Sequence, residues 1–266
     1  MCNGRKKREG GYPLLLTGTI DPRSDGETRN IEQRILQYED SIARYICETR
    51  FDPIVFIDNS PYPFDECKYA ELAKKNGKTF EFLRGTPCHE QVQQHGKGYG
   101  DGLLIYEGLT KSKVFKNVDV FYKMTGRIFL KNSDAIIRTR DRHRNEFIVY
   151  DGMGWCMTYL FKSNKSDYLQ VLADTYLESD YEKLRDLEIC FWLRLKKANL
   201  DIGSFSSYPN IEGRIGETDT PYTRSQMERY VRTIMMKIGM FTMNSNASKL
   251  IWGLYMRVSK RKPYVE

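Results

Sequence analysis

Four short polar clusters in this 266-residue chain carry groups that can bind ribose and phosphate. Small residues let a ligand approach the backbone, and a carboxylate at a strand end can accept hydrogen bonds from ribose hydroxyls. Glycine-rich backbone before a helix can hold phosphate, as can lysine and arginine. Each cluster also fits a plainer role, as a turn, a cap, a flexible loop or a pair of edge-strand cations. The clusters are Thr17–Gly18–Thr19 with Asp21 and Arg23, Asp58–Asn59–Ser60, Gly96–Lys97–Gly98–Tyr99–Gly100–Asp101–Gly102, and Tyr122–Lys123–Met124–Thr125–Gly126–Arg127.

The apolar pattern of the first half places these clusters at one edge of a sheet. Apolar residues at steps of three and four predict a helix over about 28–49, and residues 65–75 read as a second helix. Alternation of strands with helices is typical of a parallel sheet, whose ligands bind beyond the carboxyl ends of the strands. The predicted strands are Leu14–Ile20, Ile54–Ile57, Thr79–Leu83 and Val118–Lys123.

The second half changes from short strands to helices. We expect strands at Ala135–Arg138, Glu146–Tyr150 and Trp155–Phe161, and then helices over 166–177, 180–198, 223–240 and 246–259. The fold class is therefore α/β, a mostly parallel sheet with covering helices and a helical C-terminal part. We expect one domain over 10–222 and C-terminal helices with a basic tail over 223–266. Alternating arginines over 138–144 could bind an acidic acceptor or form a solvated charge run.

The net charge of +7 comes entirely from the two ends of the chain. A neutral body argues against a protein that wraps nucleic acid, whereas basic ends fit an anionic lipid or polymer, or simply solvated termini. No apolar run is long enough to span a bilayer, and Leu14–Leu16 is too short for a signal peptide. Six scattered cysteines without CxxC, and three histidines without metal-binding spacing, indicate reduced thiols, a cytoplasmic protein and no metal ligands.

In the order and context of its four clusters, the sequence resembles bacterial GT-A-type glycosyltransferases of surface-polysaccharide or lipopolysaccharide synthesis. The resemblance covers residues 14–130 and extends loosely to 222, through Glu188 and Tyr208–Gly213. It implies a GT-A-like, Rossmann-like fold that binds a nucleotide-sugar donor at the carboxyl edge of the sheet. Asp58 would lie near the nucleoside, and Lys97, Lys123 and Arg127 near the phosphates. The remaining implied donor contacts are Thr17, Gly18, Thr19, Asn59, Ser60, Gly98, Gly100, Thr125 and Gly126.

One departure concerns the metal, because GT-A enzymes commonly hold Mg²⁺ or Mn²⁺ with an Asp-x-Asp motif. No two aspartates in this sequence are two positions apart. Either a single carboxylate holds the metal with water, or cations stabilise the leaving oxyanion instead. We expect weak or absent metal dependence.

The resemblance also implies glycosyl transfer, and inversion at the sugar needs one carboxylate as a base for the acceptor hydroxyl. Glu188 is the first candidate, because the apolar run Leu187–Trp192 would raise its pKa. Asp101 and Asp151 are alternatives, and a retaining enzyme would need no such base. We predict that Lys123→Ala and Arg127→Ala abolish transfer and leave the fold intact.

The C-terminal segment mixes aromatic and basic residues over Ile251–Arg257 and Lys260–Lys262. Such a helix suits a membrane surface, where it would bring the enzyme to glycan or lipid-linked acceptors, or it packs on the core. The predicted location is therefore cytoplasmic, at the inner face of the membrane, with no nucleic-acid partner.

Two other functions remain open. A sugar-nucleotide nucleotidyltransferase should carry a glycine-rich, arginine-containing loop directly after its first strand, whereas this chain continues as Thr17–Pro22. A non-catalytic protein that binds nucleic acid or an acidic polymer fits the basic ends but not the neutral body.

Overall fold

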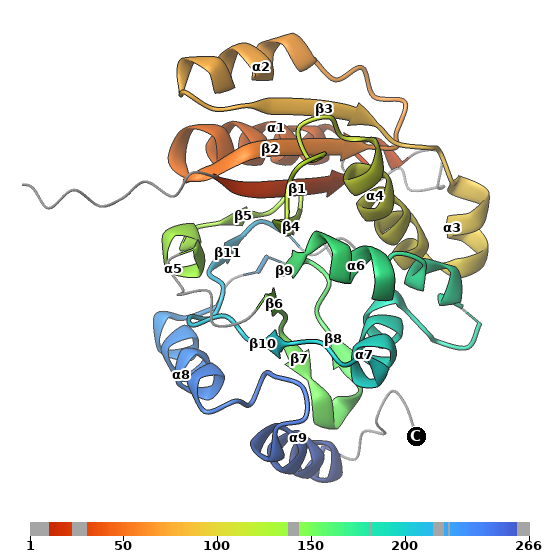
Figure 1. Ribbon diagram of the computed structural model, residues 1–266, viewed down its shortest axis with the longest axis vertical. Coiled ribbons are helices and arrows are strands. Elements are labelled where there is room, and N and C mark those ends of the chain that lie inside the picture. The colour runs from red at the N-terminus through yellow and green to blue at the C-terminus, as the bar shows by residue number, and fades with distance from the viewer. Residues whose placement is uncertain are drawn as a thin grey trace, which may run out of the picture.

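The computed structural model describes residues 11–22, 31–137, 144–180, 182–214, 221–222 and 224–259. Its centre is a seven-stranded, mostly parallel sheet in the order β10-β6-β9-β4-β1-β2-β3 (Figure 1). Strands β1 to β4 run parallel, and β9 is antiparallel to its neighbours β4 and β6. The strands are β1 (Tyr12–Gly18), β2 (Phe51–Asp58), β3 (Phe80–Arg84), β4 (Val120–Thr125), β6 (Asn145–Glu146), β9 (Leu160–Asn164) and β10 (Ile202–Gly203).

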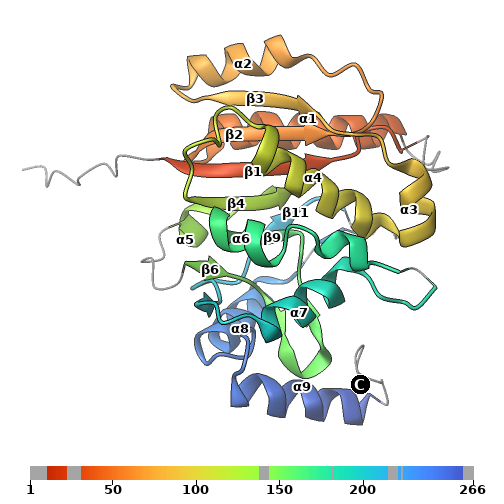
Figure 2. The ribbon, with the colours of Figure 1, turned by 45° about the vertical axis from the view of Figure 1, so that its right-hand side comes forward.

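Helices cover both faces of this sheet (Figure 2). On one face, α1 (Ile31–Glu48) and α2 (Glu66–Lys75) pack with side chains such as Leu14 and Leu16. On the other, α4 (Lys97–Lys111), α6 (Lys165–Val171) and α7 (Leu187–Lys197) pack with Leu15 and Val55. Successive residues of a strand point to opposite faces, so a strand that is buried on both reads as the unbroken apolar run seen in the sequence.

The two C-terminal helices join the first of these cores. Helices α8 (Gln226–Lys237) and α9 (Asn246–Val258) contribute Met236 and Trp252 to the apolar cluster that contains Leu14. No helix in the described ranges is long and apolar enough to cross a membrane. The boundary at residue 222 between two domains stays a prediction.

Short elements complete the described structure. Strand β5 (Phe129–Leu130) pairs with β11 (Ile211–Glu212), and β7 (Val149–Tyr150) pairs with β8 (Trp155–Cys156). The remaining helical elements are α3 (His89–His95), α5 (Ser133–Ile137), η2 (Asp151–Met153) and η3 (Thr175–Glu178).

The α/β class, the parallel strands and the order of the helices are as predicted, but the region after β4 differs. The strand predicted at Ala135–Arg138 is wrong, because Ser133–Ile137 forms α5, in which Ile136 and Ile137 are buried. The helix predicted over 180–198 begins only at Leu187, where the Asp186 side chain caps it. The helix predicted over 166–177 breaks into α6 and η3. Of the alternating arginines, all but Arg144 lie outside the described residues.

Candidate functional site

The strand ends bring three of the four polar clusters to one edge of the sheet. Thr17, near the end of β1, pairs in register with Thr125 at the end of β4, and Gly18 pairs with Asp58 at the end of β2. The Gly126 N–H donates to the Thr17 carbonyl at 2.7 Å, which fixes the turn after β4 against β1. The parallel register, which follows from the order of strands and helices, therefore assembles the edge that the sequence predicted.

Asp58 has a structural task at this edge. Its carboxylate is fully buried and accepts from the Ile20 N–H at 2.9 Å, the Ser60 hydroxyl at 2.8 Å and Arg84 Nη1 at 2.7 Å. Burial raises the pKa of Asp58, although these hydrogen bonds and the Arg84 charge oppose the shift. Because its oxygens brace the loop after β1, Asp58 in this arrangement shapes the edge rather than facing a ligand.

Thr19 and Asn59 lie next to Asp58 and link the loops after β1 and β2. The Thr19 hydroxyl donates to Asn59 Oδ1 at 2.7 Å, and Asn59 Nδ2 lies 3.4 Å from Cys88 Sγ. Thr19 is partly exposed, and its carbonyl accepts two hydrogen bonds from Arg34. These groups form a polar rim on the β2 side of the edge.

A second polar network lies on the α4 side of the same strand ends. We call it the Asp101–Glu188 cluster, and it comprises Thr17, Asp101, Lys123, Thr158 and Glu188. Asp101 accepts from the Thr17 hydroxyl at 2.6 Å and from Lys123 Nζ at 2.6 Å. Lys123 Nζ also donates to the Thr158 carbonyl at 2.9 Å, and the Thr158 hydroxyl donates to Glu188 at 2.6 Å. Both predicted catalytic carboxylates thus belong to one connected network.

The members of the Asp101–Glu188 cluster differ in how far their side chains are exposed to solvent. The Lys123 side chain is 0% exposed, whereas that of Asp101 is 27% exposed. A phosphate therefore cannot reach the Lys123 ammonium in this arrangement. Since a buried cation needs a partner, the ion pair with Lys123 holds the Asp101 carboxylate in place.

Glu188 has the titration behaviour of a base near neutral pH. Burial and the negative charges of Asp186 and Asp101 raise its pKa to about 7, although the Thr158 hydrogen bond opposes the shift. Asp186 is the N-cap of α7, which begins at Leu187. Glu188 therefore lies in the first turn of the helix, where it is partly accessible to solvent. A carboxyl group with this pKa can both accept and release a proton at neutral pH.

Thr158 has no signal in the sequence, because it falls within the predicted strand Trp155–Phe161. In the structure it occupies the connection between β8 and β9, and only the antiparallel pairing of β9 with β4 brings it to Lys123. Asp151, the third candidate base, lies elsewhere. Its carboxylate accepts from Trp192 Nε1 at 3.0 Å and from the Asn244 N–H at 3.1 Å, so it joins α7 to the C-terminal segment.

The glycine-rich run forms the beginning of helix α4 and not a loop before it, and a phosphate-binding role for these residues stays a prediction. Gly98 and Gly100 lie in the first turn of α4, and Gly102 lies one turn later. A Cβ on Gly98 would come within 2.7 Å of Leu187 Cβ, and one on Gly102 within 2.3 Å of Tyr176 Cβ. The glycines let α4 approach η3 and α7 closely, which brings Asp101 near Glu188. Lys97, the first residue of α4, is exposed.

This close packing predicts that Gly102→Ala destabilises the protein by about 1–3 kcal/mol, even though alanine favours a helix, because the methyl group overlaps Tyr176. The matched control is Gly253→Ala in α9, where nothing lies within 4 Å of the added Cβ. That variant should gain about 0.5–1 kcal/mol. Urea unfolding of both variants tests the pair, and a stabilised Gly102→Ala would contradict the packing role.

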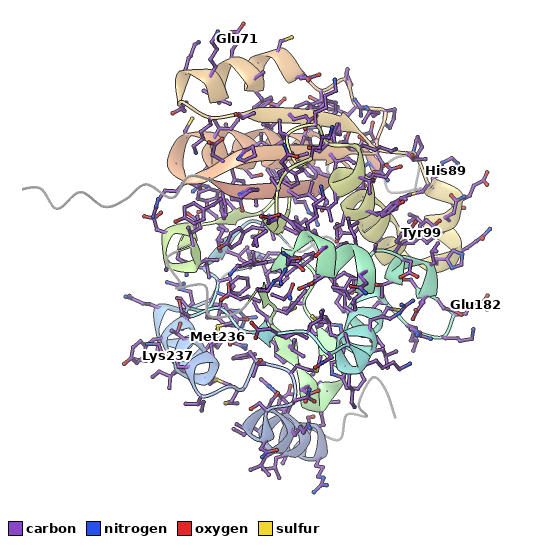
Figure 3. The ribbon with its side chains drawn as sticks, viewed as in Figure 1. Glu71, His89, Tyr99, Glu182, Met236 and Lys237 are labelled. Carbon is purple, nitrogen blue, oxygen red and sulfur yellow. The ribbon has the colours of Figure 1, made fainter. Side chains whose placement is uncertain are left out.

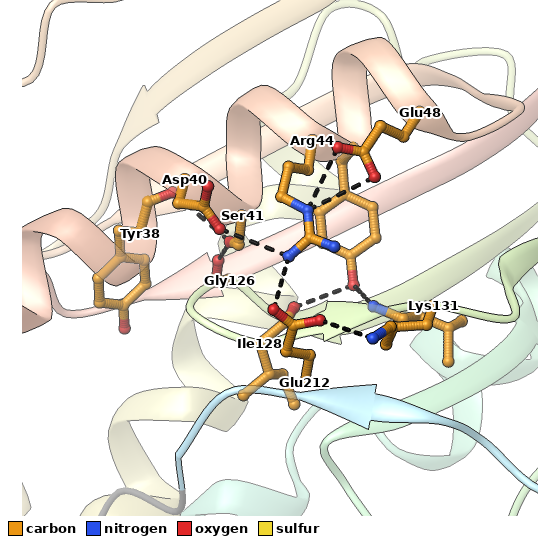
Figure 4. A network of polar contacts seen from close by, with 11 residues as sticks. Tyr38, Asp40, Ser41, Arg44, Glu48, Gly126, Ile128, Lys131 and Glu212 are labelled. Atoms are coloured by element: carbon orange, nitrogen blue, oxygen red, sulfur yellow. Dashed lines mark hydrogen bonds and ion pairs between the residues drawn. The ribbon is translucent and has the colours of Figure 1, made fainter. Parts of the chain in front are cut away.

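A cationic groove of about 610 Å³ begins at Arg127, on the α1 side of the strand ends. Six basic side chains line it against two carboxylates among the described residues, namely Arg44, Arg127, Lys131, Arg214, Arg224 and Arg229 against Asp40 and Glu212. Figure 4 shows how one wall is braced, with Glu212 between Arg44 and Lys131, at 3.1 Å from each. In the same view the Ser41 hydroxyl donates to the Gly126 carbonyl. Excess positive charge in a rigid wall suits an anionic ligand.

A small cavity lined by three tyrosines adjoins the groove. This cavity of about 20 Å³, room for a single water, lies among Tyr159, Tyr208 and Tyr222 and shares Arg224 and Arg229 with the groove. Burial raises the pKa of Tyr159 well above its ordinary value, so its hydroxyl stays protonated. Since Tyr159 directly follows Thr158, the groove and the Asp101–Glu188 cluster flank the same strand ends.

The described residues do not fit a divalent metal. No three His, Cys, Asp or Glu side chains among them lie together as a ligand set. Asp101 is paired with Lys123, and Asp58 with Arg84.

No protein-family model matches the sequence, and no similar curated protein was found. Among solved structures, the chain is similar to one described as a "putative nucleotide-diphospho-sugar transferase" from Desulfovibrio desulfuricans G20. The two share 10% sequence identity over 72% of this chain and 78% of that one, with a TM-score of 0.42. These values are too low to transfer an activity from that protein to this chain.

Proposed function

We propose that this protein is a glycosyltransferase that moves a sugar from a nucleotide-sugar donor to a glycan or lipid-linked acceptor. The Asp101–Glu188 cluster carries the proposal, because it places a carboxyl group of pKa about 7 at the carboxyl edge of the sheet. The cationic groove at Arg127 supports it from the other side of the same strand ends. A proton acceptor beside an anion-binding surface is what transfer from a sugar diphosphate needs.

In the proposed reaction Glu188 acts as the general base. The acceptor oxygen attacks the anomeric carbon as Glu188 takes its proton, and the bond from that carbon to the diphosphate oxygen breaks. The nucleoside diphosphate leaves with the bonding electrons, and basic side chains of the groove stabilise its charge. The Thr158 hydroxyl orients the Glu188 carboxylate, and Lys123 holds Asp101 beside it. This scheme inverts the configuration of the sugar.

The donor contacts are part of the proposal. Arg127 is the basic residue that we expect to meet the diphosphate, because it follows β4 directly and lines the groove. Lys97 is a second exposed cation, at the start of α4. The other proposed donor-lining residues are Thr17, Gly18, Thr19, Asn59, Ser60, Gly98, Gly100, Thr125 and Gly126, whereas the buried side chains of Asp58 and Lys123 support this edge from within the protein. Gly18 also has a packing role, because a Cβ there would meet Tyr38 at 2.5 Å.

The acceptor and location extend the proposal further. We infer a role in cell-surface polysaccharide synthesis, such as that of lipopolysaccharide or capsule, at the inner face of the membrane. The basic side chains that line the groove support an acceptor with acidic groups, because arginines bind anions.

A thermal-shift panel of UDP, GDP, CMP and dTDP, each with and without Mn²⁺, tests the proposal. One nucleotide should raise the melting temperature, because a ligand that binds only the native state stabilises it by mass action. Arg127→Ala should abolish most of this shift, measured against the melting temperature of the same variant without nucleotide. The matched control is Arg50→Ala, an exposed cation at the opposite end of the strands, which should keep the full shift.

Absence of a shift with all four nucleotides would contradict the donor site. Salt-dependent retention of the protein on DNA would then favour a non-catalytic binding protein. An equal shift in Arg127→Ala and wild type would place the diphosphate elsewhere.

A further inference from the structure

The two C-terminal helices expose apolar faces that point away from the core. On α8 and at Ile238, the C-cap residue that follows it, five large apolar side chains are between 44 and 71% exposed. They are Met227, Tyr230, Val231, Ile234 and Ile238. They recur at steps of three and four and so form one stripe, while Met236 is buried (Figure 3). An amphipathic helix of a globular protein normally buries such a stripe.

Helix α9 repeats the arrangement. Its buried row is Ser248, Trp252 and Met256, whereas Leu250, Leu254, Tyr255 and Val258 are between 43 and 84% exposed. Both helices lie at the end of the molecule opposite α2 (Figure 1). Nine large apolar side chains are exposed in one stretch of 32 residues, as one face on each helix, and exposed apolar faces of this kind mark interaction sites.

The charges on these helices identify the partner. From residue 224 to 259 the sequence has a single acidic residue, Glu228, whose side chain is 41% exposed and pairs with Arg224 and Arg232, whereas Lys237, Lys249 and Arg257 are exposed. In the sequence, Lys260, Arg261 and Lys262 follow directly. Lysine is depleted at the centre of protein interfaces, but basic residues around an apolar helix face are favoured at anionic lipid.

We propose that α8 and α9 dock this protein on a membrane that contains anionic lipid, with their apolar stripes in the headgroup region. This proposal names the surface that would hold the protein at the membrane, the location proposed above. It does not depend on the transfer reaction. Attachment through amphipathic helices of this kind is reversible and lies at the surface of the bilayer.

Vesicle co-sedimentation of the full-length protein tests this surface. We expect binding to phosphatidylcholine vesicles that contain phosphatidylglycerol, weaker binding to pure phosphatidylcholine, and a loss of the difference at high salt. Leu250→Glu, and the double variant Val231→Glu with Ile234→Glu, should each lower the partition coefficient at least about tenfold, because a charge replaces apolar area in the interface.

The matched control is Leu36→Glu on α1. Leu36 and Leu250 are both 64% exposed leucines on helices, so the two substitutions change charge and surface equally. Leu36→Glu should bind vesicles as the wild type does, and urea midpoints should show that all variants remain folded. Wild-type levels of binding by Leu250→Glu and by the double variant would overturn the proposal. So would a wild-type dimer that fails to bind vesicles and that Leu250→Glu converts to a monomer.

Discussion

Glu188→Gln should lower the transfer rate by about 10²–10⁴-fold, the usual loss when a positioned general base is removed. Glutamine has the same shape and can still accept the Thr158 hydroxyl bond, so the fold should remain intact. The rate of wild-type transfer should rise with pH through an apparent pKa of about 7 and level off above it, because only the ionised carboxylate accepts a proton. Initial rates of donor consumption across pH give both quantities.

The same substitution should change how stability depends on pH. The pKa of Glu188 is about 7 in the folded protein against 4.5 for an ordinary glutamate, so the native state takes up a proton between these values. Wild-type stability should therefore fall as pH rises from about 4.5 to 7. Glu188→Gln avoids this cost and should be the more stable protein at pH 8, by up to about 3 kcal/mol, with no difference below pH 4.

The control for both measurements is Glu182→Gln, an exposed glutamate labelled in Figure 3, which should match the wild type in rate and pH profile. A Glu188→Gln variant with full activity would remove Glu188 from the mechanism. It would leave Asp101 as the base, or indicate a retaining reaction.

Lys123→Met should abolish transfer and destabilise the protein by about 2–4 kcal/mol. This corrects the expectation that Lys123 variants keep the fold intact, because its ammonium is fully buried and pairs with Asp101 and the Thr158 carbonyl. Removing one partner of a buried pair leaves the other uncompensated, although the partial exposure of Asp101 reduces the loss. Urea unfolding measures the stability, and the rate assay measures transfer.

A double-mutant cycle separates this pairing from simple loss of volume. Asp101→Asn combined with Lys123→Met should cost about 1–3 kcal/mol less than the sum of the single variants, because the pair is already broken. Lys116→Met, at an exposed position, should stay within about 0.5 kcal/mol of the wild type. Additive costs in the cycle would show that Lys123 does not hold Asp101.

Much of the sheet could be predicted, because local patterns in the sequence indicate its strands and the helices that cover them. Runs such as Ile54–Ile57 are apolar on both faces, which indicates a parallel strand covered by helices, and the spacing of Ile35, Ile42 and Tyr45 predicts α1. Short elements were predicted poorly. The segment Ser133–Ile137 has no periodicity of its own, and its burial against distant residues decides that it is helical.

The sequence by itself determined which polar residues end the strands and therefore meet at one edge, and it singled out Glu188 from its apolar neighbours. Only the tertiary structure decided what each of them does there. Lys123 and Asp101 are separate signals in the sequence, 22 positions apart, and they form an ion pair because α4 packs on β1, the strand next to β4. The glycines of α4 suggest a loop in the sequence. The structure shows that they allow η3 and α7 to approach the helix closely, and no local sequence pattern indicates such a contact. Thr158 and the groove at Arg127 depend on contacts between strands and helices that are distant in the chain, so a single sequence contains no local trace of them.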